Sequence, residues 1–274
     1  MGSPPVKGRV LIIAGSDSGG GAGIQADIKT VTALGGYAAT AITALTIQDT
    51  SKVHGVIPTP AHDIAHQIQV VMEDIGADCI KVGMLGSVEA GRAVFTALQP
   101  YDVPIVVDPV LVATSGDALG GDGVAAFLRD ELIPMVTIVT PNASELSALT
   151  GLEVSDEVHL ETAAAALLKT GVKGVLAKAG HMDGGVVRDL YLDESGAQFI
   201  EHPRLRSRNT HGTGCTLASA VAAGVAQGLS PLAASRRAVA YVTSAIQYAP
   251  GFGKGHGPLN HALRESTDGT FEPI

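Results

Sequence analysis

Short apolar runs rich in β-branched residues alternate with longer stretches of helical periodicity along most of the chain. Short runs of this kind between turn residues are typical of strands, and longer amphipathic stretches are typical of helices. We expect strands at residues 9–15, 38–46, 79–84, 104–110, 136–142 and 174–180, and helices at 61–75, 87–98, 123–133, 159–171, 215–228 and 232–249.

This alternation predicts an α/β fold with a doubly wound, parallel sheet and helices on both faces, because strands buried on two sides are almost continuously apolar. Residues 186–205 instead indicate a hairpin that turns at residues 194–196, which we expect at an antiparallel edge. No linker, repeat or low-complexity segment interrupts the pattern. One domain covering residues 1–274 is therefore predicted, with frayed tails at 1–8 and about 265–274.

A glycine-rich turn joins the first strand to a helix. Residues 12–30, IIAGSDSGGGAGIQADIKT, contain five glycines within nine residues and then continue into an amphipathic helical pattern. Glycine allows close approach of a ligand, and a helix N-terminus offers unpaired N–H groups, so an anion or a small polar ligand is expected here.

Two known nucleotide motifs do not fit this turn. Gly21, Gly23 and Ala26 match the dinucleotide pattern, but they lie too far beyond the strand for a Rossmann turn, and no acidic residue follows about twenty residues later. An NAD-binding oxidoreductase is therefore disfavoured. A Walker A loop is excluded, because the turn does not end in Gly-Lys-Ser or Gly-Lys-Thr.

A second glycine signal lies in residues 208–224, RNTHGTGCTLASAVAAG. Gly212 and Gly214 bracket Thr213 at the start of a long apolar helix, so successive N–H groups converge on a concavity that suits a phosphate in transit. Cys215 falls in the first helical turn, where the positive end of the dipole is expected to lower the pKa of the thiol. A thiolate there could act as a general base or as a nucleophile.

Polar side chains follow nearly every predicted strand, and sheets of this class bind ligands beyond the carboxyl ends of their strands. Asp108 and Glu145 are hard oxygen ligands suited to Mg²⁺, and Lys178 is a cation suited to phosphate. The residues at the strand ends are, in chain order, Asp17, Gln48, Gly83 with Met84, Asp108, Asn142 with Glu145, Lys178 with His181, and the HGTGC turn.

Composition narrows the range of partners. A hydrophobic content of 46% excludes disorder, and no apolar run reaches the ~18 residues that span a bilayer. The net charge of −9 argues against binding to nucleic acid or to an anionic membrane, so small molecules are the expected partners. With only two cysteines and no leader pattern, we expect a cytoplasmic protein, with Cys79 in the core.

Eight motifs, in order over residues 9–263, make the chain resemble the hydroxymethylpyrimidine/phosphomethylpyrimidine kinases of thiamine biosynthesis, in the ribokinase-like superfamily. The motifs are GSDSGGGAGIQADIKT, ITALTIQDT, IKVGMLGS, VVDPV, TPN, KAGH, NTHGTGCTLASA and GHGPLNH. The resemblance implies a three-layer α/β/α fold with ATP and Mg²⁺ as co-substrates. It further implies phosphorylation of 4-amino-5-hydroxymethyl-2-methylpyrimidine to its monophosphate and then to its diphosphate. We also expect a homodimer.

The resemblance implies a ring-binding role for residues at the ends of the first strands. Gln48 would read the aminopyrimidine, because a carboxamide presents an acceptor and a donor side by side. Met84 would pack on the ring. The first glycine loop, through Gly15, Asp17 and Ala22, would close around the hydroxymethyl group.

The resemblance likewise implies which residues handle phosphate. Gly212, Thr213 and Gly214 would form an anion hole, and Cys215 would be the general base that deprotonates the substrate hydroxyl. The remaining roles would fall to Asp108 and Glu145 for Mg²⁺ and to Lys178, Asn142 and Thr213 for ATP.

Two alternatives remain beside this interpretation. Pyridoxal kinases are related and have similar glycine loops, so a pyridoxal or pyridoxine kinase is the first. A non-catalytic nucleotide-binding module on the same fold is the second. It is disfavoured by the complete set of candidate residues, Gln48, Asp108, Glu145, Lys178 and Cys215.

Overall fold

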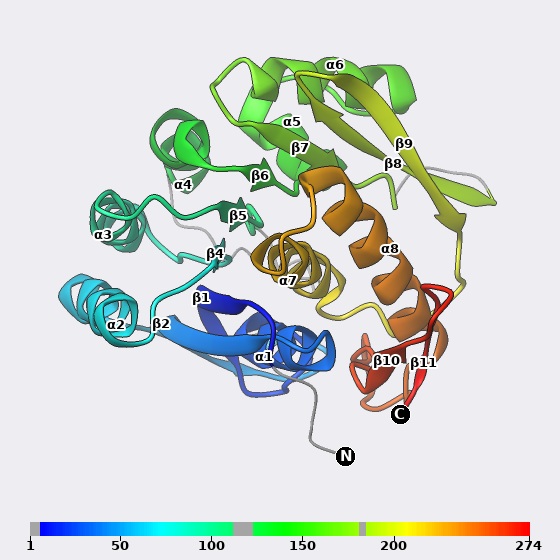
Figure 1. Ribbon diagram of the computed structural model, residues 1–274, viewed down its shortest axis with the longest axis horizontal. Coiled ribbons are helices and arrows are strands. Elements are labelled where there is room, and N and C mark those ends of the chain that lie inside the picture. The colour runs from blue at the N-terminus through cyan, green and yellow to red at the C-terminus, as the bar shows by residue number, and fades with distance from the viewer. Residues whose placement is uncertain (1–5, 112–122, 181–184) are drawn as a thin grey trace.

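A nine-stranded sheet forms the centre of the molecule (Figure 1). The structure is a computed structural model that describes residues 6–111, 123–180 and 185–274. The strand order is β3-β2-β1-β4-β5-β6-β7-β8-β9. The strands are β1 (Arg9–Asp17), β2 (Tyr37–Gln48), β3 (Val53–Pro58), β4 (Cys79–Val82), β5 (Ile105–Val107), β6 (Ile138–Val139), β7 (Gly174–Ala177), β8 (Val186–Asp193) and β9 (Gly196–Pro203).

Helices cover both faces of this sheet (Figure 1). One apolar layer is closed by α2 (Ala61–Asp74), α3 (Val88–Leu98), α4 (Val124–Phe127), α5 (Ala143–Thr150) and α6 (Glu157–Leu168). The other is closed by α1 (Gly23–Ala33), α7 (Thr213–Ala226) and α8 (Pro231–Gln247). The predicted three-layer α/β/α arrangement is therefore confirmed.

The central strands run parallel, as their continuous apolar sequences predicted. Strands β2, β1, β4, β5, β6 and β7 pair in parallel, and the predicted hairpin of β8 and β9 pairs antiparallel at one edge. From β1 the chain builds β2 on one side and later β4 on the other. Ligands of such sheets bind where the strand order reverses, beyond the carboxyl ends of β1 and β4.

Two elements differ from the expected pattern for local reasons. The helix expected at 123–133 divides into α4, a π-helical turn at Leu128–Leu132 and a 3₁₀ turn at Ile133–Met135. Pro134 has no N–H group to continue an α-helix there. The antiparallel edge strand β3 was not predicted, because it is largely exposed and its sequence, VHGVIP, contains both glycine and proline.

The C-terminal tail is not frayed, contrary to expectation. β10 (Leu263–Glu265) and β11 (Phe271–Pro273) form a two-stranded sheet, and the Phe271 ring packs edge-on against Tyr241 of α8 at 5.2 Å between ring centroids. At the other end, the Lys7 N–H donates to the Gly35 carbonyl, so the described part of the expected N-terminal tail is also held. Residues 1–5 of that tail lie outside the described part of the chain.

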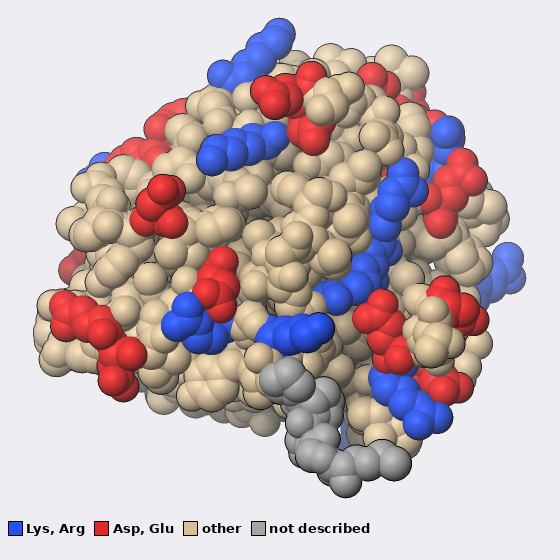
Figure 2. All heavy atoms as spheres, in the orientation of Figure 1, with Lys and Arg blue, Asp and Glu red and all other residues tan. Residues whose placement is uncertain are grey.

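Charged side chains of both signs lie on the surface of the molecule (Figure 2). On the face in Figure 2, short clusters of Lys and Arg side chains lie close to Asp and Glu side chains. In the part of the chain that the structure describes, no helix is long and apolar enough to cross a membrane.

The packing of the C-terminal sheet predicts that it stabilises the fold. Phe271→Ala removes a ring that is 4% exposed, and we expect the free energy of unfolding to fall by about 3 kcal/mol. Phe252→Ala removes a ring that is 67% exposed and serves as the matched control. Urea denaturation measures both, and equal small losses would show that the tail contributes no core packing.

Candidate active site

The two glycine loops of the sequence touch through their backbones. Gly212 has a φ of +82° and precedes α7, and a Cβ atom on it would lie 1.8 Å from the carbonyl oxygen of Gly21. A Cβ atom on Gly21 would lie 2.5 Å from Cδ2 of His211. Side chains are therefore excluded at both positions, and the N-termini of α1 and α7 meet at the carboxyl end of the sheet.

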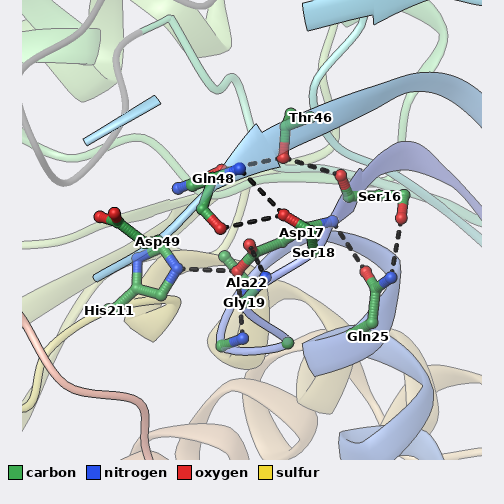
Figure 3. Close-up of polar contacts among 12 residues, drawn as sticks. Ser16, Asp17, Ser18, Gly19, Ala22, Gln25, Thr46, Gln48, Asp49 and His211 are labelled. Carbon is green, nitrogen blue, oxygen red and sulfur yellow. Dashed lines mark hydrogen bonds and ion pairs between the residues drawn. The ribbon is translucent and has the colours of Figure 1, made fainter. Parts of the chain in front are cut away.

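One buried carboxylate holds this arrangement together (Figure 3). Asp17 accepts hydrogen bonds from the N–H groups of Gly19, Gly21 and Ala22 at 2.8, 3.0 and 2.8 Å. His211 Nε2 lies 2.8 Å from Asp17 Oδ2. Burial alone would raise the pKa of Asp17, but the hydrogen bonds from His211 and the loop lower that pKa below its ordinary value. The carboxylate therefore stays ionised and clamps the first loop to the second.

His211 was not among the predicted site residues. The polar entry RNTH before the second glycine turn was the available signal, but its partner Asp17 is 194 residues away. The carboxylate of Asp17 is occupied by these contacts, so Asp17 shapes the backbone of the first loop.

The predicted ring-binding residues lie at the ends of β1, β2 and β4. The Ser18 hydroxyl lies 2.9 Å from both the N–H nitrogen and the carbonyl oxygen of Gln48, which ties the first loop to β2 (Figure 3). The Thr46 hydroxyl lies 3.1 Å from Gln48 Oε1 and steadies its carboxamide. Met84 is 7% exposed, and a Cβ atom on Gly15 would lie 2.4 Å from Met84 Cε. A side chain at position 15 would displace Met84, so glycine is needed there for Met84 to pack against β1.

The predicted phosphate residues gather beside the N-terminus of α7. Lys178 Nζ lies 3.1 Å from Asp108 Oδ1 and 3.7 Å from Glu145 Oε2. A Cβ atom on Gly214 would lie 3.2 Å from Lys178 Nζ and 3.3 Å from Asp108 Oδ2. Burial and the nearby Asp108 raise the pKa of Glu145 to about 7 against the effect of Lys178.

Three of the predicted residues also have local structural roles. Asn142 and Glu145 form a capping box at α5: Asn142 Oδ1 accepts the Glu145 N–H at 2.9 Å, and Glu145 Oε2 accepts the Asn142 N–H at 2.8 Å. The Thr213 hydroxyl donates to the Thr210 carbonyl oxygen at 2.7 Å. His181, expected beside Lys178, lies outside the described residues.

The carboxylate oxygens at this end of the sheet suit a Mg²⁺ ion that is bound together with substrate phosphates. Lys178 and Thr140 both reach Oδ1 of Asp108, whereas Oδ2 faces Gly214 at the start of α7. Among the described residues, no group of three or more His, Cys, Asp and Glu is arranged to hold a metal ion. Mg²⁺ typically binds one or two carboxylates together with substrate phosphates, which is the donor set that Asp108 and Glu145 offer.

The thiol of Cys215 differs from expectation. It lies half-buried at the start of α7, and its pKa is raised to about 12 rather than lowered. Burial is the main cause, and the carboxylates of Asp27 and Asp108 add to it, whereas Lys81 and the Gly23 N–H act in the opposite direction. The predicted lowering by the helix dipole was therefore wrong, because desolvation and two nearby negative charges outweigh it.

Solved structures share this fold over almost the whole chain. The pyridoxal kinase from Staphylococcus aureus in complex with pyridoxal superposes with a TM-score of 0.86 at 34% identity, covering 93% of each chain. The phosphomethylpyrimidine kinase from Clostridium difficile 630 superposes with a TM-score of 0.78 at 36% identity, covering 88% of this chain and 100% of that one. The fold is therefore ribokinase-like, as expected.

The sequence relatives are named for a pyrimidine kinase activity or for thiamine biosynthesis. A hydroxymethylpyrimidine/phosphomethylpyrimidine kinase of Streptomyces coelicolor is 46% identical over 259 residues, which are 94% of this chain and 95% of that protein. A bifunctional thiamine biosynthesis protein of Geobacter sulfurreducens is 45% identical over 262 residues, which are 95% of this chain and 54% of that protein's length. The sequence profile of phosphomethylpyrimidine kinase matches residues 17–260. The chain belongs to the phosphomethylpyrimidine kinase family.

Proposed function

We propose that this chain uses ATP to phosphorylate 4-amino-5-hydroxymethyl-2-methylpyrimidine and then its monophosphate, for thiamine diphosphate synthesis. The observation that carries the proposal is the contact between the two glycine loops, which brings Gln48 and Met84 to the same end of the sheet as the start of α7. A ring held by the first loop would present its hydroxymethyl group to the second. The relatives named for this activity support the choice of substrate.

The direct test is to incubate the protein with ATP, Mg²⁺ and hydroxymethylpyrimidine and to follow products by phosphorus NMR. We expect a monophosphate that is then converted to a diphosphate. Absence of either product from an active, folded preparation would contradict the proposal.

Pyridoxal is the second candidate substrate. The specific observation in its favour is the TM-score of 0.86 with a solved pyridoxal kinase, which exceeds the 0.78 found with a solved phosphomethylpyrimidine kinase. The same NMR assay with pyridoxal in place of the pyrimidine decides between the rings by their kcat/KM values.

Lys178, Asp108 and Glu145 would hold the phosphates of ATP and the Mg²⁺ ion. Bound Mg²⁺ would supply neutralisation of charge on the transferring phosphoryl group. Lys178 contributes a fixed positive charge, because its ion pairs with Asp108 and Glu145 outweigh burial and raise its pKa. Asn142 and Thr213 would shape the adjoining backbone.

Cys215 would be the base for the first transfer only. The first acceptor is a neutral alcohol whose proton must leave as the bond to phosphorus forms. The second acceptor is a phosphate monoester, which is largely ionised at neutral pH and needs no base. With a raised pKa, the thiol of Cys215 is mostly protonated at neutral pH, but the small thiolate fraction is strongly basic.

We further propose that the chain works as a single domain and as a homodimer in the cytoplasm. Exposed apolar side chains lie on the paired segment of β2 and β3, a surface that suits a second copy of the chain: Leu45, Ile47, Val56 and Ile57. Both cysteines, Cys79 and Cys215, are unpaired, which fits a reducing compartment.

Replacing Gln48 should separate binding of the ring from binding of ATP. Gln48→Leu leaves polar groups of a buried pyrimidine unpaired, which costs about 1–3 kcal/mol for each group. We expect KM for the pyrimidine to rise about tenfold or more while KM for ATP is unchanged. Gln69→Leu on the exposed side of α2 is the control, and an unchanged pyrimidine KM in Gln48→Leu would rule out the assignment.

Replacing Glu145 should change the Mg²⁺ requirement without unfolding the protein. Glu145→Gln removes a charge but keeps an oxygen that can accept the Asn142 N–H, so the capping box can persist. We expect kcat to fall about 10- to 100-fold and half-saturation to need more Mg²⁺. The raised pKa means that ionisation of Glu145 costs stability as pH rises through about 7, so Tm at pH 8 should not fall. Glu161→Gln on the surface of α6 is the control, and a lower Tm with normal Mg²⁺ dependence would make Glu145 purely structural.

Replacing Cys215 should affect the two transfers unequally. For Cys215→Ala we expect kcat/KM on the alcohol to fall about 10²–10⁴-fold and that on the monophosphate to change much less. In the parent, the alcohol step should accelerate with rising pH, because the thiolate fraction grows. Cys79→Ala removes the other thiol as a control. Equal losses in both steps would show that Cys215 holds phosphate instead of accepting a proton.

A further inference from the structure

An ion pair that is completely buried connects three elements behind the two glycine loops. Lys81 of β4 and Asp27 of α1 have no exposed side-chain surface, and Lys81 Nζ lies 2.9 Å from Asp27 Oδ2. The hydroxyl of Ser219 in α7 donates to Asp27 Oδ1 at 2.7 Å. Figure 1 shows α1 and α7 on the same face of the sheet, where they pack against each other.

This cluster lies one helical turn behind the site. Asp27 follows Gly23 by four residues and Ser219 follows Cys215 by four, and residues at this spacing share a helix face at a rise of about 6 Å. The Gly23 N–H interacts with the Cys215 thiol at the front of the two helices. The pair Asp27–Ser219 repeats the same helix–helix contact one turn further into the protein.

Stability does not explain why charges occupy this position. Burying two charges costs solvation energy, and well-packed apolar residues in their place are often as stabilising or more so. The surrounding side chains of α1, α7 and α8 are otherwise apolar or, as with Thr30 and Ser235, polar without charge. We therefore ask whether the Lys81–Asp27 pair acts on the nearby Cys215.

The cation of this pair keeps its charge and faces the site. A Cβ atom on Gly83, at the carboxyl end of β4, would lie 2.8 Å from Lys81 Nζ, so the ammonium is packed directly under the backbone there. Burial alone would lower the pKa of Lys81, but Asp27 raises that pKa above its ordinary value.

The charged groups that act on Cys215 come from several elements. They are the cations Lys81 and Lys178 and the carboxylates Asp27 and Asp108. Both carboxylates raise the pKa of the thiol, and Lys81 is the main charge that lowers it. Loss of Lys81 would leave the thiol with less compensation for its burial.

We propose that Lys81 is a positioning residue for Cys215: its ammonium, anchored by Asp27 and Ser219, stabilises the thiolate that accepts the proton of the substrate alcohol. This inference rests on the proposed function of Cys215 as the base. In that step the alcohol O–H bond breaks as the new O–P bond forms, the proton goes to the Cys215 sulfur, and the bond to the leaving ADP oxygen breaks with its electron pair. Lys81 keeps all its protons throughout.

Alkylation of Cys215 tests the inference without any assay of activity. The variant is Lys81→Met combined with Asp27→Asn, and it is compared with Asp27→Asn alone. Both proteins lack the Asp27 carboxylate, so they differ only in the cation. Iodoacetamide reacts with the thiolate, so its rate at Cys215, followed by mass spectrometry of the full-length protein from pH 7 to pH 10, reports the thiolate fraction. We expect alkylation of the double variant to be about tenfold slower than that of Asp27→Asn at each pH, which corresponds to a pKa about one unit higher.

Thr30→Val is the matched control, because Thr30 is a completely buried polar residue of α1 that carries no charge. We expect this control to keep the parent's pH profile. Equal profiles for the double variant and Asp27→Asn, or equal slowing in Thr30→Val, would overturn the role of Lys81. If the double variant is alkylated more slowly than Asp27→Asn and yet phosphorylates the alcohol at the same rate as Asp27→Asn, the ammonium acts on the thiol as inferred and the proposed base function of Cys215 is the part that fails.

Discussion

The backbone contact between Gly21 and Gly212 is the constraint on which the rest of the site depends. The carbonyl oxygen of Gly21 occupies the space where a side chain of residue 212 would begin. Because the loops can approach so closely, the first turns of α1 and α7 pack together, and the Gly23 N–H reaches the thiol of Cys215. Asp17 maintains the contact, since its single carboxylate binds the first loop and His211 of the second.

Buried charge is concentrated near the carboxyl end of the sheet, whereas the two apolar layers on its faces are otherwise built from aliphatic and aromatic side chains. Desolvation makes each of these charges costly, and each is compensated by an opposite charge or by backbone N–H groups. Asp17 depends on the loop and His211, Asp27 on Lys81, and Asp108 with Glu145 on Lys178. Removing the cation of such a group leaves its carboxylate with the full cost of burial, whereas loss of Glu145 leaves Lys178 paired with Asp108.

The residues proposed to meet phosphate and those proposed to meet the ring come from different parts of the chain. The proposed phosphate side consists of the N-terminus of α7 with Lys178, and the proposed ring side consists of the ends of β2 and β4. Solved kinases named for pyridoxal and for phosphomethylpyrimidine share this fold at TM-scores of 0.86 and 0.78. Under the proposed assignment, kinases named for two different rings share one fold because the phosphate side and the ring side are separate.

Local patterns in the sequence determined the parallel strands, most helices and both glycine loops, because periodicity and turn residues act within a few residues. They also determined that the candidate ligands follow strand ends. Only the tertiary structure decided the pairs Asp17–His211 and Lys81–Asp27, which join residues 194 and 54 positions apart. It likewise decided that Phe271 packs on Tyr241, so that the tail is ordered, and that the pKa of Cys215 is raised. The physical reason is that burial and electrostatic interactions depend on which distant segments surround a group, and no local pattern carries that information.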